Sequence, residues 1–381
     1  MSEHPLSILV ITVDWPPIEG GISTVSVELS RELVRMGYEV TVLAPALPGA
    51  EVFTPDPRIR VVHFAGYHWG WLRLFPLLAA AHRLAPHYDL ILAMNITYGG
   101  IAGLLGRALF GVPYGTFAYA YEFLKFKKIW PVAAFLRYIY GQSRGVIAIS
   151  NFTREQLVSF GVPIKRIAAI YPGARPNPQP SAAAIDLVLR NYPLDGKKLI
   201  LSVGRMIPRK GHLTLVRALP RILKRVPDAH LFIVGQGPEV SACSRAAQRM
   251  GIRENVTFAG RLSDNEVQAL YHICNVFALP TGTDRNGQVE GFGLVFTEAH
   301  AHAKPVVAGR SGGVVDAVRH EETGLLVNPN TPDDTADAII RLLLHEDFAE
   351  RLGATGKDRV ERELNWHEFT VQMLFALGVK Q

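Results

Sequence analysis

The stretch Ser7-Ile-Leu-Val-Ile-Thr-Val13 and the loop Pro16-Pro-Ile-Glu-Gly-Gly21 that follows it decide the fold. The first is a continuous apolar run, which is typical of a buried strand. An amphipathic helix is predicted from about Ser23 to Met36, with Gly37 as its stop signal, and a second strand over Glu39–Ala44. Strand, glycine loop, helix and strand form a βαβ unit, which requires a parallel sheet.

The second half of the chain repeats this order. A strand over Lys198–Val203 leads through Gly204 and a loop to Gly211, and a helix is predicted from Leu213 to about Val226. Further strands are predicted at Val61–Phe64, Leu90–Met94, Tyr114–Tyr119, Gly145–Ser150, His230–Val234, Val256–Phe258, Val276–Leu279 and Pro305–Ala308. The alternation predicts an α/β protein with two doubly wound, Rossmann-like domains, and two such domains facing each other leave a cleft in which we expect the site.

Prolines at positions 172, 176, 178 and 180 mark a linker between the two halves. We therefore expect an N-terminal domain over residues 1–177 and a C-terminal domain over residues 178–365. Residues 366–381 contain a predicted C-terminal helix, and the N-terminal domain is one surface on which this helix can pack.

Composition excludes several classes of protein. The chain is 48% hydrophobic and 19% charged, which is typical of globular proteins. Its 381 residues are enough for two domains. Only Cys243 and Cys274 are present, so a disulfide scaffold and a cysteine metal cluster are excluded and a reducing cytosol is expected. The N-terminus lacks the basic start of a signal peptide, and no apolar run reaches the ~18 residues of a membrane span.

The net charge of +6 lies almost entirely in the first half, where residues 1–177 hold 16 Lys/Arg and 11 Asp/Glu. Without a nucleic-acid motif or a long basic run, an anionic membrane surface or substrate is the better explanation. Phe123–Arg144 combines basic and aromatic residues without any acid, which suits a helix at an anionic bilayer and a peripheral location on the cytoplasmic membrane face. An ordinary helix with a solvated basic side is the alternative, and the aromatic stretch His68–Phe75 favours the membrane slightly.

Two glutamates flank a glycine turn in Glu290-Gly-Phe-Gly-Leu-Val-Phe-Thr-Glu298. Gly291 and Gly293 allow the backbone to approach a ligand, and the exposed N–H groups that open the following helix attract anions. Carboxylates would repel a phosphate, so we expect them to hold sugar hydroxyls. The stretch predicts a site for a sugar joined to a phosphate, with a helix cap and a solvated face as the alternative.

Two cations are expected to serve that phosphate. Arg205 and Lys210 lie five positions apart in a loop after a strand and could neutralise a diphosphate leaving group, although an exposed basic loop would look the same. Gly20 and Gly21 stand between a strand and a helix, where a phosphate or a sugar can bind, but such pairs are often only turns. No HExxH, EF-hand loop or Asp-x-Asp after a strand occurs, so no metal is expected.

These motifs, in this order, resemble those of the retaining glycosyltransferases of the large family 4, which have the two-domain GT-B architecture. The resemblance covers nearly the whole chain and is strongest from about Lys198 to Pro329. The motifs that carry it are Pro16-Pro-Ile-Glu-Gly-Gly-Ile22, Ser202-Val-Gly-Arg-Met-Ile-Pro-Arg-Lys-Gly211, Ile233-Val-Gly-Gln-Gly-Pro238, Val256-Thr-Phe-Ala-Gly-Arg-Leu262, Glu290-Gly-Phe-Gly-Leu-Val-Phe-Thr-Glu-Ala299, Ser311-Gly-Gly-Val-Val315 and Glu322-Thr-Gly-Leu-Leu-Val327.

The resemblance implies roles for these residues. Glu290 would contact the transferred sugar, and Arg205 and Lys210 would bind the diphosphate. Glu298 would accept hydrogen bonds from the ribose. The implied nucleotide-sugar site comprises Gly20, Gly21, Gly204, Arg261, Leu262, Phe292, Gly293, Leu294, Val295 and Glu298, with the Arg261-Leu262 backbone at the base. It also implies retention of anomeric configuration without metal or cofactor, with a diphosphate oxygen helping to deprotonate the acceptor.

The acceptor side departs from the family pattern. A His-Gly-x-Asp/Glu is usual after the strand at Tyr114–Tyr119, but Tyr119 stands here in place of the histidine, while Glu122 is retained. Tyrosine can donate a hydrogen bond but is a poor base at neutral pH. A role on the acceptor side is therefore expected for Glu122, and for Tyr119 only as a hydrogen-bonding group.

Donor and acceptor follow only from the resemblance. Thr281–Gly287, followed by Gln-Val-Glu-Gly, is similar to mannosyltransferases with lipid acceptors, which implies GDP-mannose and a lipid-linked or glycan acceptor. UDP-glucose and UDP-N-acetylglucosamine remain open as donors. Two other classes are a GT-B sugar-nucleotide epimerase, which would need no acceptor, and a non-catalytic module that binds the donor and leaves it intact.

Overall fold

The computed structural model describes residues 6–49, 53 and 55–379. By its internal contacts the chain divides into two compact units. Unit 1 comprises Met1–Pro172 together with Trp366–Gln381, and unit 2 comprises Gly173–Asn365. The change of unit thus comes shortly before residue 177, at the start of the proline-rich stretch.

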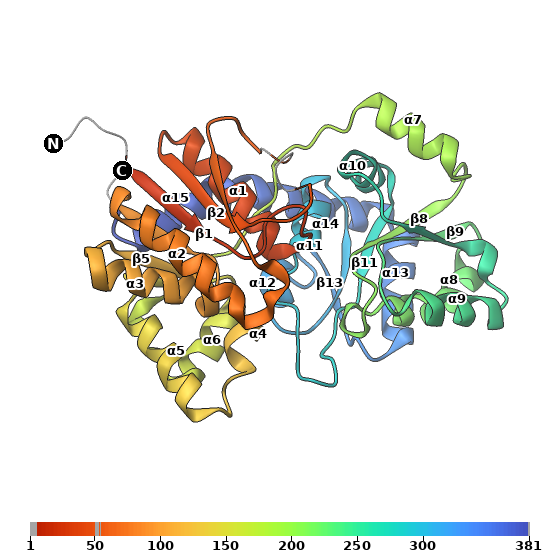
Figure 1. The fold of residues 1–381 in the computed structure, drawn as a ribbon. Helices are drawn as coiled ribbons and strands as arrows, with labels where there is room; N and C mark the ends of the chain where they lie inside the picture. The colour runs from red at the N-terminus through yellow and green to blue at the C-terminus, as the bar shows by residue number, and fades with distance from the viewer. Residues whose placement is uncertain (1–5, 50–52, 54, 380–381) are drawn as a thin grey trace. The chain divides into compact units, whose positions relative to one another are not determined.

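Unit 1 contains a seven-stranded parallel sheet in the order β3-β2-β1-β4-β5-β6-β7. Its strands β1, β2 and β5 are labelled in Figure 1. Its strands are β1 (Ser7–Ile11), β2 (Glu39–Pro45), β3 (Arg60–Phe64), β4 (Leu90–Ala93), β5 (Tyr114–Ala118), β6 (Gly145–Ala148) and β7 (Ile167–Ala169). Its helices are α1 (Gly21–Arg35), η2 (Tyr67–Arg73), α2 (Leu74–Leu84), η3 (Ala85–His87), η4 (Ile96–Gly100), α3 (Ile101–Phe110), α4 (Tyr121–Leu124), α5 (Trp130–Gln142), α6 (Asn151–Phe160), η5 (Ile164–Arg166) and α15 (Trp366–Ala376).

Unit 2 contains a six-stranded parallel sheet in the order β10-β9-β8-β11-β12-β13. Its strands are β8 (Lys198–Val203), β9 (Ala229–Val234), β10 (Val256–Gly260), β11 (Val276–Leu279), β12 (Val306–Gly309) and β13 (Gly324–Val327). Its helices are α7 (Ala182–Asn191), η6 (Pro208–Lys210), α8 (His212–Arg225), α9 (Val240–Arg249), η7 (Arg253–Asn255), α10 (Asp264–Ile273), α11 (Leu294–Ala301), α12 (Val314–Ala317), α13 (Pro332–Leu344) and α14 (Glu346–Arg362).

Hydrophobic pattern explains the first βαβ unit. The residues Ile8–Ile11 are completely buried, and strand β1 pairs with β2 in the register Ile8↔Val40. Helix α1 buries Val25, Leu29 and Leu33, which recur every four residues and therefore lie on one face. The prediction of two doubly wound parallel sheets is confirmed, with helix α1 starting two residues before the predicted Ser23.

Parallel pairing decides where polar side chains collect. The carboxyl ends of all strands in a parallel sheet meet at one edge, and ligands bind beyond that edge in open α/β folds. In unit 1 the central strands β1, β4 and β5 are direct neighbours there. In unit 2 the same holds for β8, β11 and β12.

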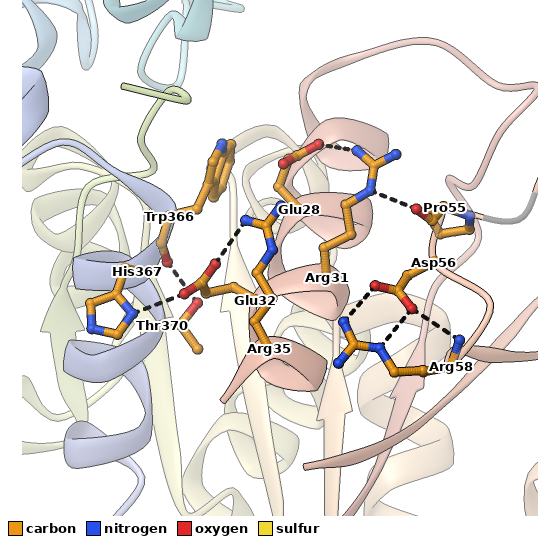
Figure 2. A network of polar contacts seen from close by, with 10 residues as sticks. All are labelled: Glu28, Arg31, Glu32, Arg35, Pro55, Asp56, Arg58, Trp366, His367 and Thr370. Atoms are coloured by element: carbon orange, nitrogen blue, oxygen red, sulfur yellow. Dashed lines mark hydrogen bonds and ion pairs between the residues drawn. The ribbon is translucent and has the colours of Figure 1, made fainter. Parts of the chain in front are cut away.

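The C-terminal helix α15 packs within unit 1, where it lies beside α1 (Figure 1). Glu32 of α1 accepts a hydrogen bond from Nδ1 of His367 at 2.8 Å and pairs with Arg35 at 3.3 Å (Figure 2). The apolar side of α15 carries Phe369, which packs against Phe117 of β5 at a ring distance of 6.2 Å. Segments more than 300 residues apart in the chain thus share one hydrophobic core.

Phe369→Ala should destabilise unit 1 by about 3–5 kcal/mol, because the buried ring leaves a cavity against Phe117 and Trp366. Phe375→Ala is the matched control, since that ring lies on the same helix but is 83% exposed. Its cost should be about 0.5 kcal/mol or less. Urea unfolding of the full chain measures both, and equal losses would contradict the packing of α15.

Candidate functional site

The loop after β8 places two cations beside the carboxyl edge of the unit 2 sheet. The short helix η6 ends at Lys210, and Gly211 follows with φ of 78° before α8 begins. A Cβ at Gly211 would also collide with the carbonyl oxygen of Pro280, just after β11. Only glycine satisfies both the left-handed backbone and this close approach. The loop is therefore held firmly against the neighbouring strand's end.

Glu290 is the centre of the candidate site. Its Oε2 atom lies 2.7 Å from Nζ of Lys210 and 2.8 Å from Nη1 of Arg209. All three side chains are mostly buried. Burial alone would raise the pKa of the Glu290 carboxyl, but the ion pairs with Lys210 and Arg209 outweigh it and lower the pKa. The carboxylate is thus an anion held by two cations.

The structure pairs the glutamate with Arg209, which the sequence analysis did not select, and not with Arg205. Arg205 is exposed on the same loop, and among the described residues no hydrogen bond or ion pair joins it to Glu290. Arg209 is adjacent to Lys210 in the Pro-Arg-Lys-Gly run, but the sequence offered no signal for choosing it. Arg209 lies in η6 together with Lys210, whereas Arg205 lies before η6, so the fold of the loop brings only Arg209 and Lys210 to the carboxylate.

Gly293 opens the helix α11, as the sequence predicted. Its φ of 95° is left-handed, and a Cβ there would come within 2.6 Å of the Phe296 ring. Leu294 and Val295 form the first turn of α11, whose backbone N–H groups have no partner within the helix. On the other side of the turn, the carbonyl of Glu290 accepts a hydrogen bond from the N–H of Gly313 at 2.9 Å.

Glu298 has surroundings very different from those of Glu290. It accepts a hydrogen bond from the hydroxyl of Tyr271 at 3.0 Å. Burial, reinforced by the Glu298 carboxylate, raises the pKa of Tyr271 well above its usual value, so the phenol stays a donor. Tyr271 lies on α10 and belongs to no motif, which is why the sequence did not reveal it.

Of the remaining predicted donor residues, all except Gly20 and Gly21 lie in unit 2, at or near the same sheet edge. Gly204 follows β8, and a Cβ at Gly235 would collide with its carbonyl oxygen. The N–H of Gly235 in turn donates to the carbonyl of Gly260, directly before Arg261 and Leu262, at 2.7 Å. The loops after β8, β9 and β10 are thereby tied together. Phe292 is buried beneath the glycine turn.

Unit 1 brings Tyr119 and Glu122 together after β5. Oε1 of Glu122 accepts a hydrogen bond from the N–H of Tyr119 at 2.6 Å, across a turn in which Ala120 has φ of 81°. The Tyr119 hydroxyl is buried and has no hydrogen-bond partner among the described residues. Gly20 and Gly21, at the start of α1, are exposed after β1, whose carboxyl end lies at the same sheet edge.

The Glu122 carboxyl titrates near neutrality. Burial raises its pKa from 4.5 to about 7, with Asp14 adding to the rise, while the Tyr119 N–H and Lys125 lower it. Asp14 follows β1 and is a further acidic residue at this edge that no sequence motif marked. The sequence does not show that Asp14 lies near Glu122, because β1 and β5 are about a hundred residues apart and are joined in the sheet only through β4.

Glu122→Gln should raise the melting temperature more at pH 8 than at pH 5. The folded state binds this proton more tightly than the unfolded state, so the stabilisation by protonated Glu122 is complete below about pH 4.5 and lost as the pH rises through about 7. Glutamine is neutral throughout and can still accept from Tyr119. Glu155→Gln, at an exposed position on α6, controls for the lost charge. A pH-independent difference would show that Glu122 is ionised normally.

Comparison with known proteins identifies the family of this chain. The model "Glycosyl transferases group 1" matches residues 186–359, and the model "Glycosyltransferase Family 4" matches residues 19–177. A GDP-mannose-dependent alpha-(1-6)-phosphatidylinositol monomannoside mannosyltransferase of Mycobacterium tuberculosis is 32% identical over 373 residues, 96% of each chain. The protein of the same description from Mycolicibacterium smegmatis is 33% identical over 364 residues, 92% of each chain.

Two solved structures share the fold. Anabaena HepE, in complex with UDP and glucose, superposes with a TM-score of 0.82 over 98% of this chain and 100% of that one, at 21% identity. Sucrose-phosphate synthase from Thermosynechococcus elongatus gives a TM-score of 0.80 over 97% of both chains, at 26% identity. Together with the family matches, these findings show that the chain is a GT-B hexosyltransferase and belongs to glycosyltransferase family 4.

Proposed function

We propose that this enzyme transfers mannose from GDP-mannose to a hydroxyl of a lipid-linked or glycan acceptor at a membrane surface, with retention of configuration and without a metal ion. The observation that carries the proposal is the Glu290 carboxylate held between Lys210 and Arg209, next to the start of α11. Two mostly buried cations beside a helix N-terminus suit a diphosphate. The relatives described as GDP-mannose-dependent support the choice of donor.

On the donor side, the diphosphate takes the place of Glu290 on the two cations. Lys210 and Arg209 then face phosphate oxygens, the N–H groups of Leu294 and Val295 add hydrogen bonds, and Arg205 is available on the same loop. Glu290, freed from its ion pairs, contacts the hydroxyls of the mannose. Glu298 binds the ribose, and its position on α11, fixed by Tyr271, supports this role.

In the reaction, the bond between the anomeric carbon and the diphosphate oxygen breaks, and the acceptor oxygen bonds to the anomeric carbon on the same face. The acceptor proton passes to the departing diphosphate, so GDP leaves as the second product. Lys210 and Arg209 stabilise the negative charge that develops on the leaving group. Such preorganised electrostatic stabilisation is commonly the largest contribution to catalysis.

The acceptor is bound by unit 1. Its carboxyl edge offers the buried Tyr119 hydroxyl, the Glu122 carboxyl and Asp14, which are groups that hydrogen-bond to sugar or polyol hydroxyls. Glu122 orders the turn through its bond to the Tyr119 N–H. Tyr119 then acts as a hydrogen-bonding group and not as a base, because burial raises its pKa well above the usual value.

The segment Phe123–Arg144 faces an anionic membrane in this proposal. Lys125, Lys127 and Lys128 are exposed between α4 and α5, although Nζ of Lys127 also lies 3.1 Å from Oγ of Ser159. Juxtaposed lysines and aromatic rings support a bilayer contact. A solvated basic side on an ordinary helix remains the second interpretation. Within the described ranges, no helix has both the length and the apolar character needed to cross a bilayer.

Metal independence also forms part of the proposal. It is supported by the lack of an Asp-x-Asp pair after a strand. In the part of the chain that the structure describes, no three His, Cys, Asp or Glu side chains gather as potential metal ligands. The two cations of the candidate site would supply the charge compensation that a divalent ion supplies elsewhere.

A UDP-sugar transferase is the second candidate, because the fold also matches a structure that contains UDP and glucose. Thermal stabilisation by GDP, UDP and ADP, each with and without EDTA, separates the donors, since a ligand of the folded state raises the melting temperature. We expect a selective shift with GDP that EDTA does not change. Selectivity for UDP would transfer the assignment to glucose or N-acetylglucosamine, and GDP-mannose conversion without acceptor would indicate an epimerase.

Glu290→Ala and Lys210→Ala should have opposite signatures. Removal of Glu290 should lower turnover by about 100- to 1,000-fold, yet leave GDP affinity unchanged or higher, because the two cations lose their competing anion. Lys210→Ala should weaken GDP binding on the order of tenfold by removing a charged hydrogen bond. Isothermal calorimetry with GDP and an assay of GDP release measure both. Parallel losses of affinity and turnover in Glu290→Ala would refute its place at the sugar.

A further inference from the structure

Three tryptophans are exposed in unit 1 although such side chains are usually buried. The chain has five tryptophans, of which Trp15 and Trp366 are buried. The exposed fractions of the other three are 59% for Trp69, 71% for Trp71 and 74% for Trp130. Contiguous exposed apolar side chains of this size mark interaction sites more often than random surface.

Two of these tryptophans lie on the short helix η2, together with other exposed apolar side chains. We call Trp69, Trp71, Leu72 and Phe75 the tryptophan ridge; all four are exposed on η2 and the start of α2. The Trp69 ring packs so closely on Gly66 that a Cβ there would lie 2.7 Å away, and Trp71 contacts Phe75 at a ring distance of 6.2 Å. Each tryptophan thus has a packing partner within the chain, on either side of the kink at Gly70.

The ridge is connected to the basic segment through η4. The guanidinium of Arg73, at the end of η2, stacks over the ring of Tyr98 at 4.2 Å. Helices α4 and α5, which flank the exposed Lys125, Lys127 and Lys128, pack against the same η4. Since η2, η4 and α4 directly follow the parallel strands β3, β4 and β5, all three lie at the carboxyl edge that also holds Tyr119 and Glu122.

The charge of this part of the chain is almost all of one sign. Residues 57–154 contain 11 Lys/Arg and only two acids, Asp89 and Glu122. Asp89 accepts hydrogen bonds from Ser7 at the opposite, amino end of the sheet. The Glu122 carboxyl is turned inward onto the Tyr119 backbone. Among residues 57–154, therefore, no acidic side chain opposes an anionic surface at the carboxyl edge. Asp14 after β1 and the exposed Glu155 at the start of α6 are acids that this edge holds in addition to them.

We propose that the tryptophan ridge, together with Ile129 and Trp130, inserts into the interfacial layer of an anionic bilayer, while Lys125, Lys127 and Lys128 bind the lipid phosphates. This inference rests on the proposed lipid acceptor and adds the part of unit 1 that enters the membrane. Tryptophan rings prefer the bilayer interface, where an apolar body and a polar N–H are both satisfied. The insertion places the acceptor-side residues next to the bilayer, from which a lipid acceptor reaches them without leaving the membrane.

Intrinsic tryptophan fluorescence tests this directly. Because Trp15 and Trp366 are buried, a change on binding reports Trp69, Trp71 and Trp130. Vesicles of phosphatidylcholine with phosphatidylglycerol should shift the emission to shorter wavelength and protect it from acrylamide, and phosphatidylcholine alone should do so weakly. Unchanged emission and quenching with vesicle-bound protein would overturn insertion. A failure to bind vesicles at all would overturn the bilayer as the partner and point to a protein.

Variants separate insertion from charge. Trp69→Ala with Trp71→Ala should weaken vesicle binding on the order of tenfold, with little dependence on salt, because the lost contribution is apolar. Replacing Lys125, Lys127 and Lys128 with alanine should weaken binding mainly at low salt. Phe375→Ala, an exposed ring on α15, is the matched control and should bind as the wild type does. Wild-type binding by the tryptophan variant would refute the ridge.

Different results would refute the proposed donor and the insertion of the tryptophan ridge. The tryptophan variant should keep the full thermal shift with GDP, since none of the predicted donor-site residues lies on η2 or α2. It should also keep transfer to a water-soluble acceptor, while losing transfer to a lipid-linked form of that acceptor embedded in vesicles. Absence of any GDP shift in the wild type would refute the proposed donor, whereas normal transfer in vesicles by the variant would refute only the ridge.

Discussion

Parallel strand pairing is the constraint on which the rest of this enzyme depends. It brings the carboxyl ends of distant strands to one edge of each sheet, so that side chains from separate loops meet there. In unit 2 this edge joins the cation loop after β8 to the turn that opens α11. In unit 1 it joins Asp14, Tyr119 and Glu122 with the tryptophan ridge. In both units the parallel pairing of the strands brings these residues together.

Close backbone contacts turn this edge into a defined site. Gly211 lies against Pro280, and Gly235 lies against Gly204, at distances that exclude any Cβ. The loops can therefore carry mostly buried charges without large rearrangement. Removing two cations from water is costly unless an anion accompanies them. Glu290 provides that anion in the structure. In the proposed function a donor diphosphate would take its place on the two cations.

Much of the fold could be predicted because long, buried strands and amphipathic helices leave clear patterns. The predicted bounds of β8 and β11 agree with the structure. The strands β7 (Ile167–Ala169) and β13 (Gly324–Val327) were not predicted, since three or four residues at a sheet edge show too little periodicity. Arg209 was missed for another reason. Arg205 and Arg209 look equivalent in a sequence because both lie in the loop after β8, and only the folded loop, which pairs Arg209 of η6 with Glu290, distinguishes them.

The sequence by itself determined the two parallel sheets, the family and the glycine turns, because these depend on local pattern and on motifs in a fixed order. Only the tertiary structure decided that Glu290 pairs with Arg209, that Asp14 influences Glu122, and that α15 completes the core of unit 1. It also decided that the tryptophan ridge and the basic segment share one sheet edge. Such contacts join residues far apart in the chain, and their distances follow from strand order and packing, which no local pattern contains.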